Sequence, residues 1–320
     1  MPAETTSQGP ADPAASDPAA RSGVIHDLGY RRYDGPRLGR AQIGRALAWH
    51  SLRSAFGIGR GIKAKIVPMI TFIIMCLPAV VNAVAVALST SHARAIPYDT
   101  YLPGLRVLVM TVFIAVQAPE LVSRDLRNHV LPLYFARPVR RPDYPLAKLA
   151  AFTAACLIMI EVPELLLYLG TVIQAHGGSA IWAETRALIP GLLVGLMWAV
   201  VLAAIGLALA SFSGRRAYAT GTIAIFFFLS WTLAGLLGSI VGHDRGPSLA
   251  AGAPAGVHLA GLISPFTVLD GVREWLGGST DRGIVPEPGH YGPAYGLMLL
   301  VFLGAGAGAL IARYRKAGMV

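Results

Sequence analysis

Six long apolar runs constrain what this chain can fold into. Each run approaches the ~20 residues that an α-helix needs to cross the hydrocarbon layer of a membrane. Their apolar residues are continuous rather than alternating, which excludes a barrel of membrane-spanning strands. The runs predict an all-α, multi-pass membrane protein with spans near residues 66–89, 101–121, 149–174, 187–211, 217–241 and 292–312. The composition agrees with this prediction, because 54% of the residues are hydrophobic and only 14% are charged.

The basic residues predict the orientation of these spans. Of the 27 lysines and arginines, 21 fall on one side of the six spans, five fall on the other, and Arg106 lies within the second span. The positive-inside rule therefore predicts a cell-membrane protein with both termini in the cytoplasm. This asymmetry also accounts for the net charge of +10, so the charge does not indicate a nucleic-acid partner.

The hydrophilic parts of the chain divide into three further segments. Residues 1–37 are rich in Pro, Ala and Ser and are expected to form a disordered cytoplasmic tail. Residues 38–60 combine one apolar face with arginines, which is typical of a helix lying among lipid headgroups; an ordinary soluble helix is the alternative. Within the transmembrane domain, residues 61–315, the stretch 249–277 is too short and interrupted for a simple span. It predicts either a re-entrant pair at the outer surface or an amphipathic helix resting on it.

Sequence motifs of catalysis are absent. The chain has no GxxxxGK[ST] phosphate-binding loop and no GxSxG nucleophile motif, and the glycines of GIGRG, residues 57–61, follow no strand and indicate a flexible link. No His, Cys or Glu cluster has metal-ligand spacing, and both cysteines lie inside apolar runs. We therefore expect no enzymatic activity and no catalytic, cofactor-binding or metal-binding residues.

Charged residues inside the membrane are costly and usually have a partner or a function. Arg106 lies in the second span, and Glu161 and Glu164 lie one helical turn apart in the third. From the cytoplasmic ends of these antiparallel spans, Arg106 is ~21 Å and Glu164 ~22 Å along its helix. The matching depth predicts an Arg106–Glu164 ion pair, with Glu161 facing the same seam or a central cavity. The pair could be a structural staple or part of a proton or substrate relay.

The cytoplasmic loop at 121–148 is more elaborate than a tether needs to be. It carries short apolar stretches, several arginines and the adjacent aromatics Tyr134 and Phe135, and prolines 138, 142 and 145 interrupt any continuous helix. Aromatics that fill a pocket and arginines that pair at its rim are typical of a docking element. The predicted docking residues are Arg124, Asp125, Arg127, Tyr134, Phe135, Arg137 and Arg141.

This loop resembles the first cytoplasmic loop of ABC-2 type permeases, the membrane subunits of bacterial ABC exporters. The positions that carry the resemblance are Glu120, Arg124, Asp125, Arg137, Pro138, Arg141, Tyr144 and Lys148. The layout of residues 38–315 is similar too, with an amphipathic helix before six spans, a tight turn after the fourth, and an interrupted segment marked by Ser264, Pro265 and Phe266 before the last. The long N-terminal tail and the long outer segment depart from a minimal member.

The resemblance implies an ABC-2 exporter fold and a permease that forms half of a transmembrane pathway. Its loop at 121–145 would dock on a separate ABC ATPase subunit, and a second permease half, identical or different, would complete the pathway among the membrane lipids. ATP hydrolysis would occur on the partner. The alternatives are a non-transporting membrane regulator or scaffold, and a proton-coupled secondary transporter that uses Glu161 and Glu164.

Overall fold

The computed structural model describes residues 35, 39–88, 96–99, 101–128, 130–135, 140–175, 177–242, 255–277 and 288–317. The chain separates into two units, Met1–Leu38 and Gly39–Val320, and every helix belongs to the second. The expected tail at 1–37 lies, apart from Gly35, outside the described residues. Within these ranges the secondary structure is helical without strands: α1 Arg40–Ala55, α2 Ile62–Leu88, α3 Pro103–Leu121, α4 Ser123–Arg127, α5 Leu131–Phe135, α6 Asp143–Gln174, α7 Gly178–Ser211, α8 Arg216–Gly242, α9 Ala255–Gly261, α10 Pro265–Gly277, η3 Gly289–Tyr291 and α11 Gly292–Ala317.

Six of these helices are long and apolar enough to cross a membrane, and they coincide with the six apolar runs that the sequence predicts. The chain therefore has the helices of a multi-pass membrane protein. The largest differences from the predicted bounds are at the starts of α6 and α7, which begin at Asp143 and Gly178 rather than near 149 and 187. Pro145, expected to block a helix, lies in the first turn of α6. Proline is tolerated there because the first backbone N–H groups of a helix have no intrahelical acceptor.

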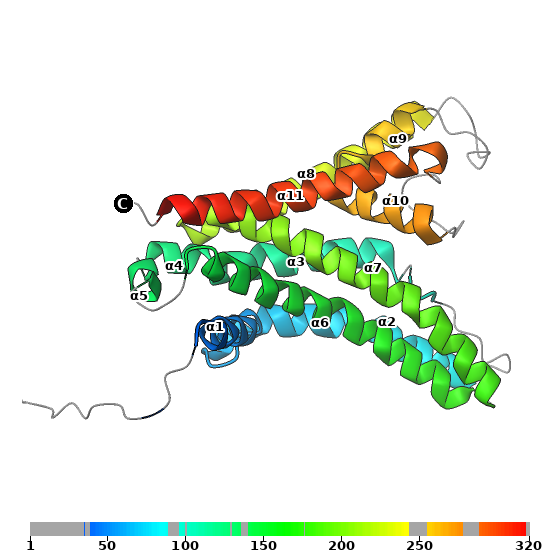
Figure 1. Ribbon diagram of the computed structural model, residues 1–320. Helices are drawn as coiled ribbons and strands as arrows, with labels where there is room; N and C mark the ends of the chain where they lie inside the picture. Colours follow the sequence, from blue (N-terminus) through cyan, green and yellow to red (C-terminus); the bar gives the residue numbers. More distant parts are fainter. Residues whose placement is uncertain are drawn as a thin grey trace, which may run out of the picture. The chain divides into compact units, whose positions relative to one another are not determined.

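Helix α7 lies between α6 and α11, and these neighbours make much of the bundle core (Figure 1). Its second half, from Trp198 to Ser211, is buried at nearly every position. Helix α3 packs against α7, α8 and α2, while α6 contacts α1, α2 and α7. Charged side chains of α3 and α6 are therefore held inside protein rather than in lipid.

The turn between α1 and α2 is tight. Gly57 adopts a left-handed backbone with φ of 70°, and a Cβ at this position would lie 2.6 Å from the carbonyl oxygen of Ala64. A side chain would therefore be strained and would clash with the first turn of α2. The sequence suggests that this glycine-rich stretch is a flexible link. In the structure it forms a defined turn.

Helices α9 and α10 form a pair bent by 117° at a break of a few residues, which fits a broken span or a re-entrant loop. On α10 the side chains of Phe266, Leu269 and Val272 are buried, whereas Leu276 is 73% exposed. The Phe266 ring packs 5.5 Å from Trp198 of α7 and 5.3 Å from Phe227 of α8. The bent pair is thus part of the core of the bundle.

Candidate functional site

A buried ion pair joins α3 to α6. Nη2 of Arg106 donates to Oε1 of Glu164 at 2.6 Å, and the two side chains are 3% and 0% exposed. The Arg106 guanidinium also lies 5.3 Å from the centre of a Trp198 ring. This is the pair that the matching depths predict. Because both charges are removed from solvent, each depends on the other.

Glu161 lies beside this pair, and both of its carboxylate oxygens are buried, yet neither has a hydrogen-bond partner among the described residues. A Cβ added at Gly195 of α7 would lie 2.1 Å from Oε1 of Glu161, and one at Gly191 would lie 3.0 Å from Oε2 of Glu164. Gly191 and Gly195 lack this Cβ. They make room between α6 and α7 for two carboxylates.

The loop that follows α3 is anchored to the bundle through Asp125. This carboxylate accepts a hydrogen bond of 2.6 Å from the hydroxyl of Tyr144 and lies 2.8 Å from Nζ of Lys148, both in the first two turns of α6. The Tyr144 ring packs 5.0 Å from Tyr314 of α11 and 5.4 Å from Tyr134 of α5. Asp125 and Tyr134 were predicted as docking residues, with Tyr134 exposed. Tyr134 is only partly exposed, and both residues bind the loop to its own bundle.

The other predicted docking residues divide into two groups. Arg124, Arg127 and Arg141 are exposed, as a docking surface requires. Arg137 and the side chain of Phe135 lie outside the described part of the chain. On α5 the structure adds a residue that the prediction omits, because Leu133 is 70% exposed. An isolated leucine among aromatics gives little signal in the sequence.

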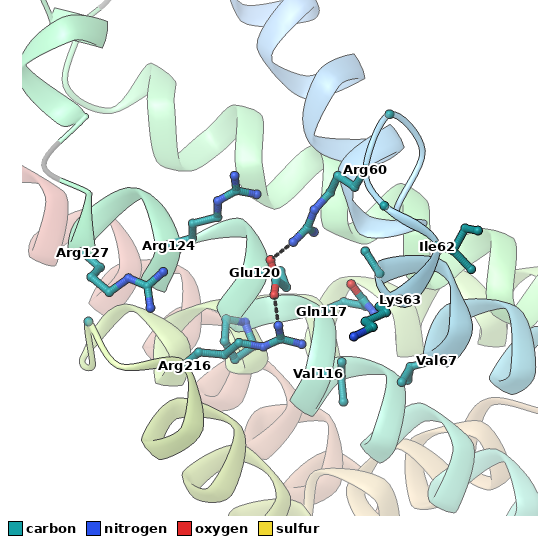
Figure 2. A pocket seen from close by; sticks show the side chains of 15 residues that line it. Arg60, Ile62, Lys63, Val67, Val116, Gln117, Glu120, Arg124, Arg127 and Arg216 are labelled. Atoms are coloured by element: carbon teal, nitrogen blue, oxygen red, sulfur yellow. Dashed lines mark hydrogen bonds and ion pairs between the residues drawn. The ribbon is translucent and has the colours of Figure 1, made fainter.

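A basic cavity of about 1010 Å³ lies where the α1–α2 turn, the end of α3, helix α4 and the α7–α8 turn meet. Figure 2 shows Glu120 at its centre, bound on opposite oxygens by Arg60 and Arg216. Lys63, Arg124 and Arg127 also line it. In the sequence Glu120 is marked only by the family resemblance, and nothing indicates this cavity, because Arg60 and Arg216 are 156 residues apart in the chain.

Two further charged contacts were not predicted. Arg40 at the start of α1 binds Asp143 at the start of α6, and this hydrogen bond raises the pKa of the guanidinium above its ordinary value. At the opposite end of α6 and α7 from the loop, buried Arg273 of α10 lies 3.1 Å from Asp99 and 3.1 Å from Glu274. The Arg40–Asp143 and Arg273–Asp99 contacts join residues that are distant in the sequence, so no periodic pattern marks them.

The described residues contain no group of three or more His, Cys, Asp or Glu side chains arranged to hold a metal ion. They do offer charge pairing inside the bundle and a cluster of basic side chains around a cavity at one end of it. No model of a known protein family matches the chain, and no curated protein sequence matches it either.

Proposed function

We propose that this chain is the permease subunit of an ATP-binding cassette exporter with the ABC-2 fold. It would span the cell membrane six times with both termini in the cytoplasm and form half of a transmembrane pathway. A separate ABC ATPase would drive it, and a second permease half would complete the pathway. The resemblance of residues 38–315 to that family motivates the proposal, and the absence of a phosphate-binding loop in the sequence is consistent with a separate ATPase.

The observation that carries the proposal is the anchoring of the loop by Asp125. A loop that receives force must move as one body with the helices that it drives. Asp125 bonds to Tyr144 and Lys148, and Tyr144 packs on Tyr314, so α4 and α5 are tied to α6 and α11. A surface loop that only connects two spans needs no buried lysine, since burying a charge is costly without such a partner.

A second candidate is a proton-coupled transporter. It is favoured by Glu161, whose two buried oxygens have no hydrogen-bond partner, because an unpaired carboxylate inside a membrane is a typical proton-binding group. It is the weaker candidate because it leaves the anchored loop without a role. Measuring export with and without ATP hydrolysis separates the two functions.

The docking prediction is tested on Leu133, the exposed apolar residue of α5. A charge at the centre of an apolar contact lowers affinity strongly. Leu133→Asp should therefore reduce, at least tenfold, the amount of ATPase subunit that copurifies with the tagged chain from its native membranes. The recovered protein is identified by mass spectrometry as a polypeptide with a phosphate-binding loop and an ABC signature.

Leu133→Met is the matched control, because it keeps an apolar side chain of similar volume and should retain the ATPase. Both variants are compared at equal membrane abundance and equal melting temperature in detergent. Recovery of no ATPase with the unaltered chain, or equal recovery with the two variants, would contradict the docking proposal.

A further inference from the structure

The basic cavity has a surplus of positive charge that its own residues do not neutralise. Five basic side chains line it, from Arg60, Lys63, Arg124, Arg127 and Arg216, against the single carboxylate of Glu120. Arg60 and Arg216 share that carboxylate. Within the described part of the chain, no ion pair engages the other three. The described residues that line the cavity thus carry a formal charge of about +4, which attracts anions.

The charges come from four separate segments that the fold brings together. Arg60 lies in the α1–α2 turn, Lys63 on α2, Arg124 and Arg127 on α4, and Arg216 at the start of α8 (Figure 2). A second hollow of about 730 Å³ shares Arg127 and Arg216 with the first and adds Arg215. Surface arginines that only repel one another would be expected to spread apart. Glu120 instead holds two of them at the centre.

The cavity also has an apolar side. Ile62, Val67 and Val116 line it together with the basic residues. Ile62 is 81% exposed, and the exposed residues Ile66 and Ile70 continue from it along α2, a helix of membrane-spanning length. A ligand with an anionic head and apolar chains would match both sides, with its chains lying along α2.

We propose that this cavity binds the phosphate headgroup of an anionic phospholipid. Guanidinium groups match the geometry of phosphate oxygens, and the cavity lies at the ends of membrane-length helices, where headgroups are found. Its volume is at the upper end of the range of roughly 300–1,000 Å³ that is usual for ligand sites. An acidic peptide in solution would use the charges but would leave the apolar strip of α2 uncovered.

This proposal does not depend on an ATPase partner. Arg124 and Arg127 belong both to the cavity and to the predicted docking surface, so variants there would disturb both. Lys63 and Glu120 line the cavity but are not among the predicted docking residues. Tests on these two residues can therefore fail while the docking test on Leu133 succeeds, and the reverse.

The test uses the full chain, purified in an uncharged detergent, and follows bound lipid by native mass spectrometry during titration. Phosphatidylglycerol should bind at least tenfold more tightly than phosphatidylcholine, whose quaternary amine cancels the phosphate charge. Lys63→Gln should weaken phosphatidylglycerol binding about fivefold, the effect of one basic residue near an anionic lipid. Lys65→Gln, on the same helix but outside the cavity, should leave it unchanged.

Glu120→Gln gives a test of opposite sign. It removes the only negative charge among the described residues that line the cavity, and it keeps a side-chain oxygen that accepts a hydrogen bond from an arginine, so phosphatidylglycerol should bind about fivefold more tightly. A variant that merely damaged the fold would weaken binding. Inorganic phosphate is titrated alone as the third ligand and should bind more weakly than the lipid, because it does not use the apolar side.

Three results would overturn the proposal. Equal binding of phosphatidylglycerol and phosphatidylcholine would mean that the surplus charge selects nothing. Equal weakening by Lys63→Gln and Lys65→Gln would mean that only the general charge of the surface matters. Inorganic phosphate binding as tightly as the lipid would assign the cavity to a soluble anion.

Discussion

Glu164 and Glu120 are both buried carboxylates bound by arginine, but their surroundings differ. Glu164 is fully buried inside the bundle and bonds to Arg106 alone, whose own side chain is 3% exposed. Glu120 lies at the end of α3 with a side chain 7% exposed, and it bonds to two arginines that remain 22% and 55% exposed. The Arg106–Glu164 pair itself has one charge of each sign and is removed from solvent. The Glu120 site has a surplus of positive charge and an open cavity.

The carboxylate–arginine contact therefore has a different role at Glu164 than at Glu120. A one-to-one pair out of water neutralises itself and joins α3 to α6, and it leaves nothing for a ligand to bind. A carboxylate shared by two arginines concentrates basic groups that would otherwise repel, and the uncompensated charge is available to an anion. Removing an arginine partner should therefore cost much folding stability at Glu164 and little at Glu120.

The largest effect is expected for Arg106→Leu. It leaves the fully buried Glu164 without a partner, which typically costs about 3–5 kcal/mol of folding free energy. The variant should unfold at a markedly lower temperature in detergent and reach a lower abundance in membranes.

The control for Arg106→Leu is the double variant Arg106→Leu with Glu164→Leu. It replaces the pair by apolar side chains and should be more stable than the single variant. Exchanging the two residues, Arg106→Glu with Glu164→Arg, should also recover part of the loss. If both double variants are as unstable as the single ones, the two side chains do not form a pair in the membrane.

An intermediate effect is expected at Gly195, which faces the unpaired Glu161. Gly195→Ala places a methyl group where Oε1 of Glu161 lies, so the carboxylate or its helix must shift, at a cost of about 1–3 kcal/mol. Gly235→Ala is the matched control, because its position in α8 is open and alanine favours a helix by roughly 1 kcal/mol. The thermal unfolding temperature should therefore fall for Gly195→Ala and rise for Gly235→Ala.

A double-mutant cycle identifies the cause at Gly195. Glu161→Ala removes the obstructing carboxylate, so Gly195→Ala should cost less in that background than in the unaltered chain. An unchanged cost would mean that Glu161 does not occupy the space between α6 and α7.

The sequence predicts the parts of this fold that depend on local composition. Apolar run length identifies all six membrane-length helices, and depth along antiparallel helices is enough to pair Arg106 with Glu164. The starts of α6 and α7 are missed because charged residues interrupt their apolar runs, Asp143 and Lys148 in α6 and Glu184 and Arg186 in α7. Hydropathy marks where a helix enters lipid and does not mark where its hydrogen bonds begin.

Tertiary contacts account for what the sequence could not predict. Asp125 was interpreted as part of a docking surface, yet it binds Tyr144 and Lys148, which lie beyond three prolines and a loop. The cavity around Glu120 requires the turn of the chain at Gly57 and the turn between α7 and α8 to meet. Contacts of this kind depend on how helices pack, for which a single sequence carries no periodic signal.

The smallest effect is expected for Arg216→Gln. Arg60 continues to pair with Glu120, and the lost partner is 55% exposed, so the cost should be only about 0.2–1 kcal/mol and should shrink at high salt. Combining it with Arg60→Gln leaves the carboxylate unpaired, and the double variant should lose more than the sum of the single changes. Thermal unfolding in detergent at low and high salt measures all three. Arg216→Gln alone could instead destabilise the protein as much as Arg106→Leu. That result would mean that Glu120 depends on one partner as Glu164 does, and that the cavity has no uncompensated positive charge.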